Sequence, residues 1–564
     1  MRSALFLALV VVALAASASL AAVEKITRNG KFLVKPDGTR FYIKGLAYQE
    51  SLPTAEQTPE SLGQGGYPEP TNYVDPLAQP DACSRDVKLM QDLGINTIRV
   101  YSVNSSLNHD GCMKTFDDAG IYVVIDLGLP GQGSINRAAP TWDAGLLRQY
   151  LLTAEAFWNY PNTLALGVAN EVVTQNNNTD ALPFVRAAAR DVKAFLRANG
   201  KSDLLLTYSA ADAPSGPTGR RTLLAEYLAC GSADERVDIL GINSYSWIGQ
   251  SSFQAAGYQT LVDDFASLPI PVYFSEFGGV PGNDPDARPW TEVGSIYSPP
   301  LSNVLSGGVA FTYFPKDPSS EGKDYSLTTM DGNNITPRPS FQALKTQLGA
   351  ANPPTSLANN TGGSSTIDCP AQSDAFLAST TLPPTPDDAL CACGLANVFS
   401  CVANQRAQSS PDIIGTLLDY TCSALGELGQ NCSGVEASGT TGTYGTWSSC
   451  NAAQRLDWAM SQFYDANNRQ AEACSFSGNA TSNTNITTVQ AARSGQEQCL
   501  RDNPVGVRTP TLNAGTGNGS TGRGGEAGGS TNAQGDNSAA HHSFQLVALL
   551  ALTVCSTVLI ALVL

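Results

Sequence analysis

Between residue 23 and about residue 345, the hydrophobic pattern predicts buried strands that alternate with amphipathic helices. Short apolar runs of the kind that form strands buried on both faces are Phe41–Gln49, Thr97–Asn104, Tyr122–Leu129, Thr163–Val172, Leu204–Ser209, Val237–Tyr245, Val272–Gly278 and Gly307–Phe314. Helical spacing of apolar residues marks Asp81–Leu93, Ala144–Trp158, Leu182–Asn199 and Gln259–Ser267. Alternating strands and helices predict a parallel sheet, and eight units within about 300 residues favour a (β/α)8 TIM barrel of the α/β class.

An open, doubly wound sheet is the alternative architecture. Its dinucleotide-binding form would carry a glycine-rich phosphate-binding loop after the first strand, and the sequence has none there. The G-x-G-x-x-G match from Gly517 to Gly522 lies in a glycine-rich stretch of low complexity. We therefore expect the barrel, with its active site at the carboxyl ends of the strands.

Each apolar run ends in polar or aromatic residues, which a barrel would gather at one face. These strand-end residues are Tyr48 and Gln49, Tyr101 and Asn104, Asp126, Asn170 and Glu171, Tyr208 and Ser209, Asn243 and Tyr245, Glu276, and Tyr313. A polar end to one strand means little by itself. Two glutamates, Glu171 on the fourth run and Glu276 on the seventh, make the pattern specific, because a buried carboxylate is costly unless it is paired or used.

Two strand-end carboxyl groups about 5 Å apart form the machinery of a retaining glycosidase. We expect Glu171 to be the acid/base and Glu276 the nucleophile. Asn170 could hold the sugar 2-hydroxyl, and Tyr245 could donate to Glu276 and keep that carboxylate ionised. The alternative is that either glutamate is a salt-bridged structural residue.

Both ends of the chain carry segments typical of targeting. Residues 1–22 combine Arg2, an apolar run and small residues, which predicts a secretory signal peptide; the run is short for the alternative, a membrane anchor. Residues 546–564 are apolar and uncharged. With the small residues before them, they predict a GPI-addition propeptide over 538–564, attached at Asn537 or alternatively Gly535, and a location on the outer face of the plasma membrane. A C-terminal transmembrane helix is the alternative.

The cysteines predict a second, disulfide-rich domain. Cys555 lies in the apolar tail, and an even set in a secreted chain implies disulfides. That set is Cys83, Cys112, Cys230, Cys369, Cys391, Cys393, Cys401, Cys422, Cys432, Cys450, Cys474 and Cys499. Zinc is the rival interpretation of the cluster from Cys391 to Cys499. Secretion and the lack of C-x2-C pairs argue against it, so no metal site is expected.

Changes in composition set the expected domain boundaries. They are the catalytic barrel over 23–349, a linker over 350–368, a Cys-rich module over 369–500 and a Gly/Ser/Asn-rich stalk over 501–537. In the module, Tyr444, Trp447, Trp458 and Phe463 could include a sugar-stacking platform or form the core of a small domain. The sequence leaves both alternatives open.

Charge and histidine content exclude several classes of function. The formal net charge of −17 argues against nucleic acid as a partner, whereas a neutral polymer would be indifferent to it. The chain has 3 histidines, and His541 and His542 follow the expected attachment residue. A Ser-His-Asp triad and a multi-histidine metal site are therefore not expected, which favours a hydrolase run by carboxylates without a cofactor.

Five segments of the first domain carry a recognisable set of motifs. They are Lys44–Gln49, Ile98–Val103, Asn170–Val172, Gly241–Trp247 and Ser275–Gly278. From about residue 24 to 350 the chain closely resembles the fungal β-1,3-glucanosyltransferases of glycoside hydrolase family 72. The Cys-rich region is similar to the X8-type carbohydrate-binding module of that family, through Cys432–Val435, Gly442–Gly445 and Cys474–Gly478.

The resemblance implies roles for individual residues. It makes Glu171 the acid/base and Glu276 the nucleophile. The donor-sugar contacts that it implies are Gln49, Tyr101, Asp126, Asn170, Tyr245 and Tyr313. It pairs Cys83 with Cys112 and Cys230 with Cys369, while pairing within the module stays open. The chain lacks a further cysteine pair that the family often has in the catalytic domain.

The reaction implied by the resemblance is transfer. The enzyme would cut a β-1,3-glucan internally, hold one part on Glu276 and pass that part to another chain. Tyr101, Tyr313 and Trp247 could stack on the acceptor sugar and exclude water. The alternatives are an endo-β-1,3-glucanase that only hydrolyses and an inactive glucan-binding wall protein.

Overall fold

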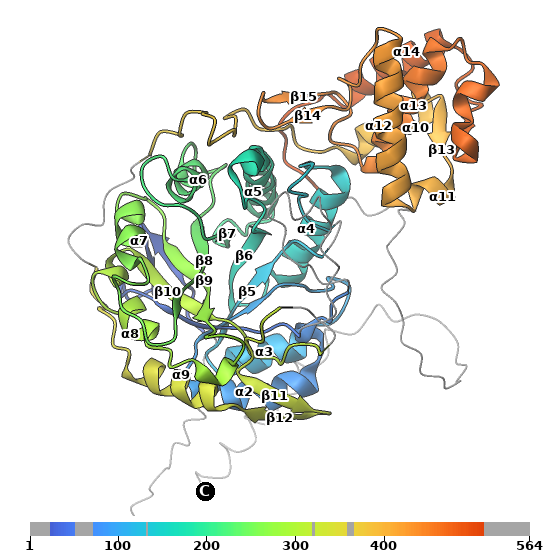
Figure 1. Ribbon diagram of the computed structural model, residues 1–564. Helices are drawn as coiled ribbons and strands as arrows, with labels where there is room; N and C mark the ends of the chain where they lie inside the picture. Colours follow the sequence, from blue (N-terminus) through green and yellow to red (C-terminus); the bar gives the residue numbers. More distant parts are fainter. Residues whose placement is uncertain (1–22, 51–71, 131–132, 319–321, 358–365, 513–564) are drawn as a thin grey trace, which may run out of the picture. The chain divides into compact units, whose positions relative to one another are not determined.

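Eight parallel strands close into a barrel in the computed structural model, which describes residues 23–50, 72–130, 133–318, 322–357 and 366–512 (Figure 1). Around the barrel, the strand order is β10-β3-β4-β5-β6-β7-β8-β9. The strands are β3 (Ile43–Ala47), β4 (Thr97–Val100), β5 (Tyr122–Asp126), β6 (Thr163–Asn170), β7 (Leu205–Ala211), β8 (Ile239–Ile248), β9 (Val272–Gly279) and β10 (Leu305–Ala310). The predicted (β/α)8 barrel and all eight of its strands are confirmed.

Helices surround the barrel and bury their apolar faces on it (Figure 1). They are α2 (Pro80–Leu93), α3 (Asp110–Asp118), α4 (Ala144–Phe157), α5 (Leu182–Ala198), α6 (Arg220–Ala229), α7 (Tyr258–Phe265), α8 (Glu292–Ile296) and α9 (Pro339–Ala350). The four predicted helices correspond to α2, α4, α5 and α7. Among those that the pattern missed, α8 is only five residues long. Helix α6 buries residues from Arg221 to Ala229 on most of its faces, so it lacks the single apolar stripe that marks a helix.

Two apolar layers hold the barrel together. Alternate strand residues such as Val124, Tyr273 and Val309 form one cluster with Leu33, which comes from the short hairpin of β1 (Thr27–Asn29) and β2 (Phe32–Val34). The intervening residues, such as Val123, pack outward in the larger core shared with the helices. Successive residues of a strand face these two layers in turn, and both layers are apolar. The strands are therefore continuous hydrophobic runs.

Residues 366–386 lie against the barrel helices. Cys369 is bonded to Cys230, and the Phe376 ring packs edge-on against Tyr227. The Leu377 amide donates to Thr179 Oγ1 at 2.7 Å. The barrel core therefore continues beyond the composition change at residue 369. Another hairpin, β11 (Thr328–Asp331) with β12 (Asn334–Pro337), precedes α9.

The Cys-rich module is a small helical unit with its own core. Its elements are α10 (Asp388–Asn397), β13 (Cys401–Ala403), α11 (Gln405–Gln408), α12 (Pro411–Glu427), β14 (Ala437–Ser438), β15 (Thr443–Tyr444), α13 (Ala452–Ala466), β16 (Ala480–Ser482) and α14 (Val489–Asp502). Trp447 and Trp458 are buried in one of its clusters, so the core interpretation holds for these two. Phe463 is partly buried and packs against Phe476.

Six disulfides account for the twelve predicted cysteines. Cys83–Cys112 and Cys230–Cys369 confirm the pairs implied by the resemblance. The module pairs, which the sequence left open, are Cys391–Cys450, Cys393–Cys499, Cys401–Cys474 and Cys422–Cys432. Each of these four disulfides closes a loop in a domain with few apolar residues. The closed loop reduces the conformational entropy of the unfolded chain.

The predicted signal peptide, Asn537 and the GPI propeptide lie outside the described residues. So do part of the linker and most of the stalk. Within the described ranges, no helix combines the length and apolar character needed to cross a bilayer.

Candidate active site

The end of β6 delivers Asn170 and Glu171 in an unusual backbone conformation. Glu171 has φ +49°, a left-handed conformation that costs a non-glycine residue free energy. Its amide donates to Ser209 O on β7 at 2.8 Å, which fixes the turn. Asn170 is exposed and Glu171 partly so, and both remain accessible to a ligand. Strain of this kind is tolerated where a side chain must be aimed at a reacting group.

A buried asparagine on β8 connects the two glutamate-bearing strands. Asn243 Nδ2 donates to Glu171 Oε1 at 2.7 Å, and Ser275 Oγ on β9 donates to Asn243 Oδ1, also at 2.7 Å. In the ladder of β8 and β9, Asn243 is the partner of Glu276. The side chain of Glu171 is thus oriented by the strand next to the one that carries Glu276.

The carboxylate of Glu276 is buried among a cation and tyrosines. Arg99 Nη1 lies 3.2 Å from Glu276 Oε1, and the Tyr245 hydroxyl donates to Oε2 at 2.6 Å. The predicted contact between Tyr245 and Glu276 is therefore present. Both partners favour the ionised carboxylate, the form that a nucleophile requires.

The two glutamates have different electrostatic surroundings. Burial raises the pKa of Glu171 to about 7, with a further contribution from the negative charge of Glu276, while the Asn243 hydrogen bond acts in the opposite direction. Burial also raises the pKa of Glu276, but the Arg99 charge and the Tyr245 hydroxyl oppose that rise. Glu171 is thus suited to carry a proton near neutral pH, whereas Arg99 and Tyr245 favour the ionised form of Glu276.

Arg99 joins three of the predicted site residues. It is fully buried, and its Nη2 donates to Asp126 Oδ2 at 2.7 Å and to Asn170 Oδ1 at 3.0 Å. Asp126 is packed closely against β6, since a Cβ on Gly167 would lie 2.2 Å from Asp126 Oδ1. Gly167 therefore makes room for the carboxylate that balances Arg99.

Gln49 braces the loops around the site. Its Oε1 accepts hydrogen bonds from the amides of Tyr101 at 3.2 Å and Ser102 at 3.0 Å, and its Nε2 donates to Val74 O at 2.7 Å. These bonds occupy its acceptor and one of its two donors. Its role as a sugar contact stays a prediction that rests on the remaining donor.

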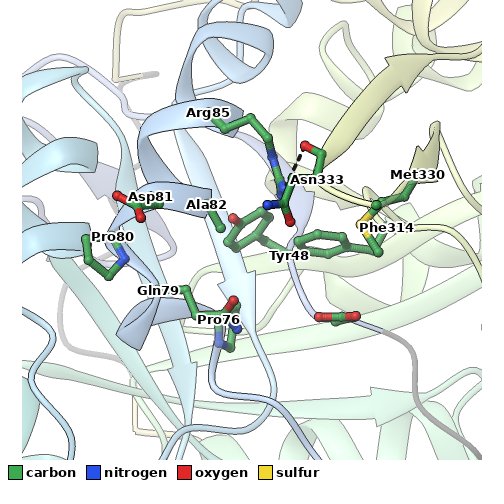
Figure 2. Close-up of a pocket in the computed structure, with 12 residues that line it drawn as sticks. Tyr48, Pro76, Gln79, Pro80, Asp81, Ala82, Arg85, Phe314, Met330 and Asn333 are labelled. Carbon is green, nitrogen blue, oxygen red and sulfur yellow. Dashed lines mark hydrogen bonds between the residues drawn. The ribbon is translucent and has the colours of Figure 1, made fainter. Parts of the chain in front are cut away.

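Tyr313 is fully buried, and its hydroxyl is engaged by Asp86 on α2. It donates to Asp86 at 2.9 Å, and Tyr48 donates to the same carboxylate at 2.8 Å. Burial, and then the Asp86 charge, raise the pKa of Tyr313. The neighbouring cavity of about 670 Å³, lined by Tyr48, Arg85 and Phe314, includes neither glutamate (Figure 2). A contact between Tyr313 and donor sugar stays a prediction.

Four aromatic side chains, which we call the aromatic wall, stand beside Glu276: Tyr101, Tyr245, Phe311 and Tyr325. Their ring centroids lie 5.3–6.3 Å apart in edge-on or tilted pairs. The Tyr101 hydroxyl is buried, and the charge of Glu276 raises its pKa in addition to the effect of burial. By contrast, Trp247 is buried and donates to Thr291, so its ring is not exposed to an acceptor.

Sequence reasoning missed Arg99, Phe311 and Tyr325 as site residues. An arginine inside an apolar strand was a usable indication for Arg99, because arginine is rarely buried without a partner. Tyr325 lies in an irregular segment after β10, and no local pattern marks it. Among the described residues, no cluster of three or more His, Cys, Asp or Glu side chains could hold a metal ion.

The site therefore belongs to the class of barrel glycosidases that use two carboxyl groups. A protonatable Glu171 follows the fourth barrel strand, a cation-paired Glu276 lies in the seventh, and the aromatic wall stands beside Glu276. This arrangement suits an acid/base and a nucleophile.

Comparison with known proteins agrees. The chain belongs to the glucanosyltransferase family of glycoside hydrolases, family 72, which matches residues 13–352, and an X8 domain matches residues 399–481. The 1,3-beta-glucanosyltransferase gas1 of Schizosaccharomyces pombe is 36% identical over 464 residues, 82% of this chain and 79% of that protein. The 1,3-beta-glucanosyltransferase GAS2 of Saccharomyces cerevisiae is 34% identical over 456 residues, 78% of this chain and 76% of that protein.

Solved structures of Saccharomyces cerevisiae Gas2p share the fold. A mutant in complex with laminaritetraose and laminaripentaose has a TM-score of 0.70 at 30% identity, covering 86% of this chain and 99% of that one. The complex with laminaripentaose has a TM-score of 0.70 at 31% identity, covering 83% and 99%. The predicted family and barrel-plus-module architecture are thus confirmed.

Proposed function

We propose that this glucanosyltransferase cleaves β-1,3-glucan inside the chain and transfers the cut segment to another glucan chain with retention of configuration. In this mechanism, Glu171 is the acid/base and Glu276 is the nucleophile. The observation that carries the proposal is the contrast between the two carboxyl groups. Burial raises the pKa of Glu171 to about 7, whereas Glu276 is bound by Arg99 and Tyr245.

In the first step, Glu276 attacks the anomeric carbon while Glu171 protonates the leaving oxygen. A glycosyl ester forms on Glu276, and the reducing-end part of the glucan departs. The negative charge of Glu276 is consumed in this ester, so the pKa of Glu171 falls and the group becomes a base.

In the second step, an acceptor hydroxyl oxygen attacks the same carbon. Glu171 takes its proton, the ester bond breaks, and the Glu276 carboxylate is released. Water can attack in the same way, so transfer requires that a sugar occupy the acceptor position before water does. The aromatic wall supplies ring faces and edges for that sugar.

Donor binding follows from the polar groups beside the glutamates. Asn170 is exposed and next to Glu171, and we assign it to the sugar 2-hydroxyl. Asp126, Tyr101, Tyr245, Gln49 and Tyr313 complete the proposed donor contacts. The X8 module would hold the glucan polymer near the barrel, as expected of a carbohydrate-binding domain.

The proposal places the enzyme outside the cell, at a glucan wall. Six disulfides in the described residues support an oxidising compartment. The N-terminal apolar segment supports secretion. The C-terminal apolar segment supports a GPI anchor joined at Asn537, with residues 501–537 as the stalk and 350–368 as the linker.

A product-length assay tests the proposed function. Secreted protein is incubated with a single laminari-oligosaccharide, and the products are separated by size. Products longer than the substrate are expected, and Glu171→Gln should remove them. If only shorter products form, the chain is an endo-glucanase. If the substrate binds but is never converted, the chain is a binding protein.

A further inference from the structure

A buried guanidinium lies behind the aromatic wall. Arg288 is 2% exposed and follows the short 3-10 turn Pro285–Ala287. Its acceptors are Pro285 O at 3.2 Å, Gly278 O at 3.5 Å, Phe311 O at 2.8 Å, Tyr325 O at 2.8 Å, Ser326 O at 3.1 Å and Ser340 Oγ at 3.4 Å. It therefore binds mostly backbone carbonyls.

Two of these carbonyls belong to residues of the aromatic wall. The Phe311 and Tyr325 rings lie 5.6 Å apart, and each packs against Tyr245, at 6.2 Å and 5.3 Å. Tyr245 donates to Glu276. Arg288 thus binds the backbone of Phe311 and Tyr325. The rings of these two residues pack against Tyr245, the side chain that contacts the nucleophile.

We propose that Arg288 is a positioning residue that sets the balance between transfer and hydrolysis by fixing Phe311 and Tyr325 around the acceptor position. This inference rests on the proposed function. An acceptor sugar must settle against these rings before water attacks the glycosyl ester on Glu276. If the two backbone segments drift apart, the rings lose their mutual geometry and water gains access.

The site is built for an arginine. The planar guanidinium presents several donors in a fixed fork, which a lysine ammonium cannot reproduce. It stacks over Trp290, with its central carbon 4.4 Å from the ring centroid. A Cβ on Gly278 would lie 2.5 Å from the Trp290 ring, so the glycine at the end of the nucleophile strand admits the tryptophan.

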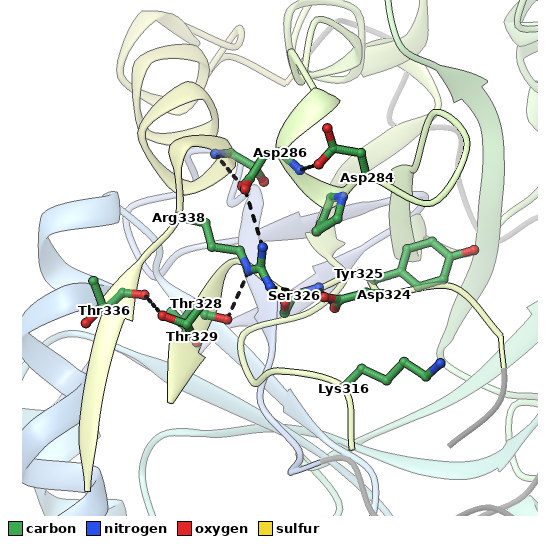
Figure 3. Close-up of polar contacts among 12 residues, drawn as sticks. Asp284, Asp286, Lys316, Asp324, Tyr325, Ser326, Thr328, Thr329, Thr336 and Arg338 are labelled. Atoms are coloured by element: carbon green, nitrogen blue, oxygen red, sulfur yellow. Dashed lines mark hydrogen bonds and ion pairs between the residues drawn. The ribbon is translucent and has the colours of Figure 1, made fainter. Parts of the chain in front are cut away.

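A second arginine secures the same segment from outside. Arg338 bridges Asp286 at 3.3 Å and Asp324 at 3.2 Å, and Asp324 in turn accepts from the Ser326 amide at 2.9 Å (Figure 3). Figure 3 shows Tyr325 extending from this cluster. Arg338 is partly exposed, so its replacement disturbs the segment with less risk to the fold.

The test compares three variants in the product-length assay, with transfer and hydrolysis products quantified separately at initial rates. Arg288→Lys should lower the transfer-to-hydrolysis ratio by about tenfold, within the loss that a small misplacement can cause. Arg338→Gln should lower it by a smaller factor. Arg40→Lys is the matched control, because Arg40 is a buried arginine that binds the carbonyls of Ser302 and Leu305 away from the glutamates.

A lowered ratio in Arg288→Lys, with Arg40→Lys unchanged, supports the proposal. An unchanged ratio in folded Arg288→Lys overturns it, as does an equal fall in the control. If Arg288→Lys does not fold, the Arg338→Gln ratio decides in the same way. Absence of longer products from the unmutated protein contradicts the proposed function instead, so the two failures are distinguishable.

Discussion

The Tyr245 hydroxyl donates a 2.6 Å hydrogen bond to Oε2 of Glu276, while Arg99 Nη1 lies 3.2 Å from Oε1. Both oxygens of a buried carboxylate are therefore engaged before any substrate arrives. Burial alone would favour the neutral acid, and these two partners oppose that effect. The resulting carboxylate is held in one orientation.

Replacement of Tyr245 should change the pH dependence of the reaction. The Tyr245 hydrogen bond lowers the pKa of Glu276, so Tyr245→Phe should raise that pKa. The acidic limb of kcat/KM, below which the nucleophile is protonated, then moves to higher pH. The pH–rate profile measures this shift. Tyr258→Phe removes a buried hydroxyl without a described hydrogen bond and should leave the limb in place; equal shifts would refute the assignment.

The pKa of Glu171 should depend on the charge of Glu276. The unmutated carboxyl is expected to titrate at about 7, because burial and then the charge of Glu276 raise its pKa. Glu276→Gln removes that charge and should lower the pKa of Glu171. Carbon-13 NMR of labelled glutamate side chains measures both values. An unchanged value in the variant would mean that the two groups do not interact.

Loss of Asn243 should impair catalysis while raising the pKa of the acid/base. Its hydrogen bond to Glu171 lowers that pKa and orients the carboxyl group. In Asn243→Ala we expect kcat to fall by about 10²-fold, at the lower end of general acid–base contributions. The basic limb of the pH–rate profile should move to higher pH. A limb that moves to lower pH would contradict this role.

Arg99 should matter for stability as well as for activity. Its removal in Arg99→Met leaves Asp126 and Glu276 without their shared cation, and breaking a buried pair costs about 3–5 kcal/mol. Urea unfolding measures this loss. Arg197→Met, which breaks an exposed pair with Asp234, should cost no more than about 1 kcal/mol. Similar losses in the two variants would argue against the buried network.

The strands and both glutamates could be predicted because local patterns carry them. Buried parallel strands are continuous apolar runs, and Glu171 and Glu276 interrupt two of them abruptly. The near-absence of histidine then argued against a Ser-His-Asp triad and a multi-histidine metal site. The side chains that bind the two glutamates were harder to predict. The bond from Asn243 to Glu171 depends on the register of three successive strands, β6, β7 and β8, which a linear pattern does not encode.

Residues predicted to bind sugar separate into two groups in the structure. Asp126, Asn170, Tyr101 and Tyr245 lie together around Arg99 and Glu276. Gln49 and Tyr313 instead make hydrogen bonds within the protein, to loop backbone and to Asp86. Their contact with sugar stays a prediction, because a position at a strand end does not encode the direction in which a side chain points.

The most direct test of the mechanism is to trap the glycosyl-enzyme. A laminari-oligosaccharide carrying 2-fluoro and anomeric fluoride groups should slow the second step and leave a covalent ester. Peptide mapping by mass spectrometry should then find the added sugar on Glu276, with no label in Glu276→Gln. A label on Glu171 or Asp126, or turnover with inversion at the anomeric carbon, would contradict the account.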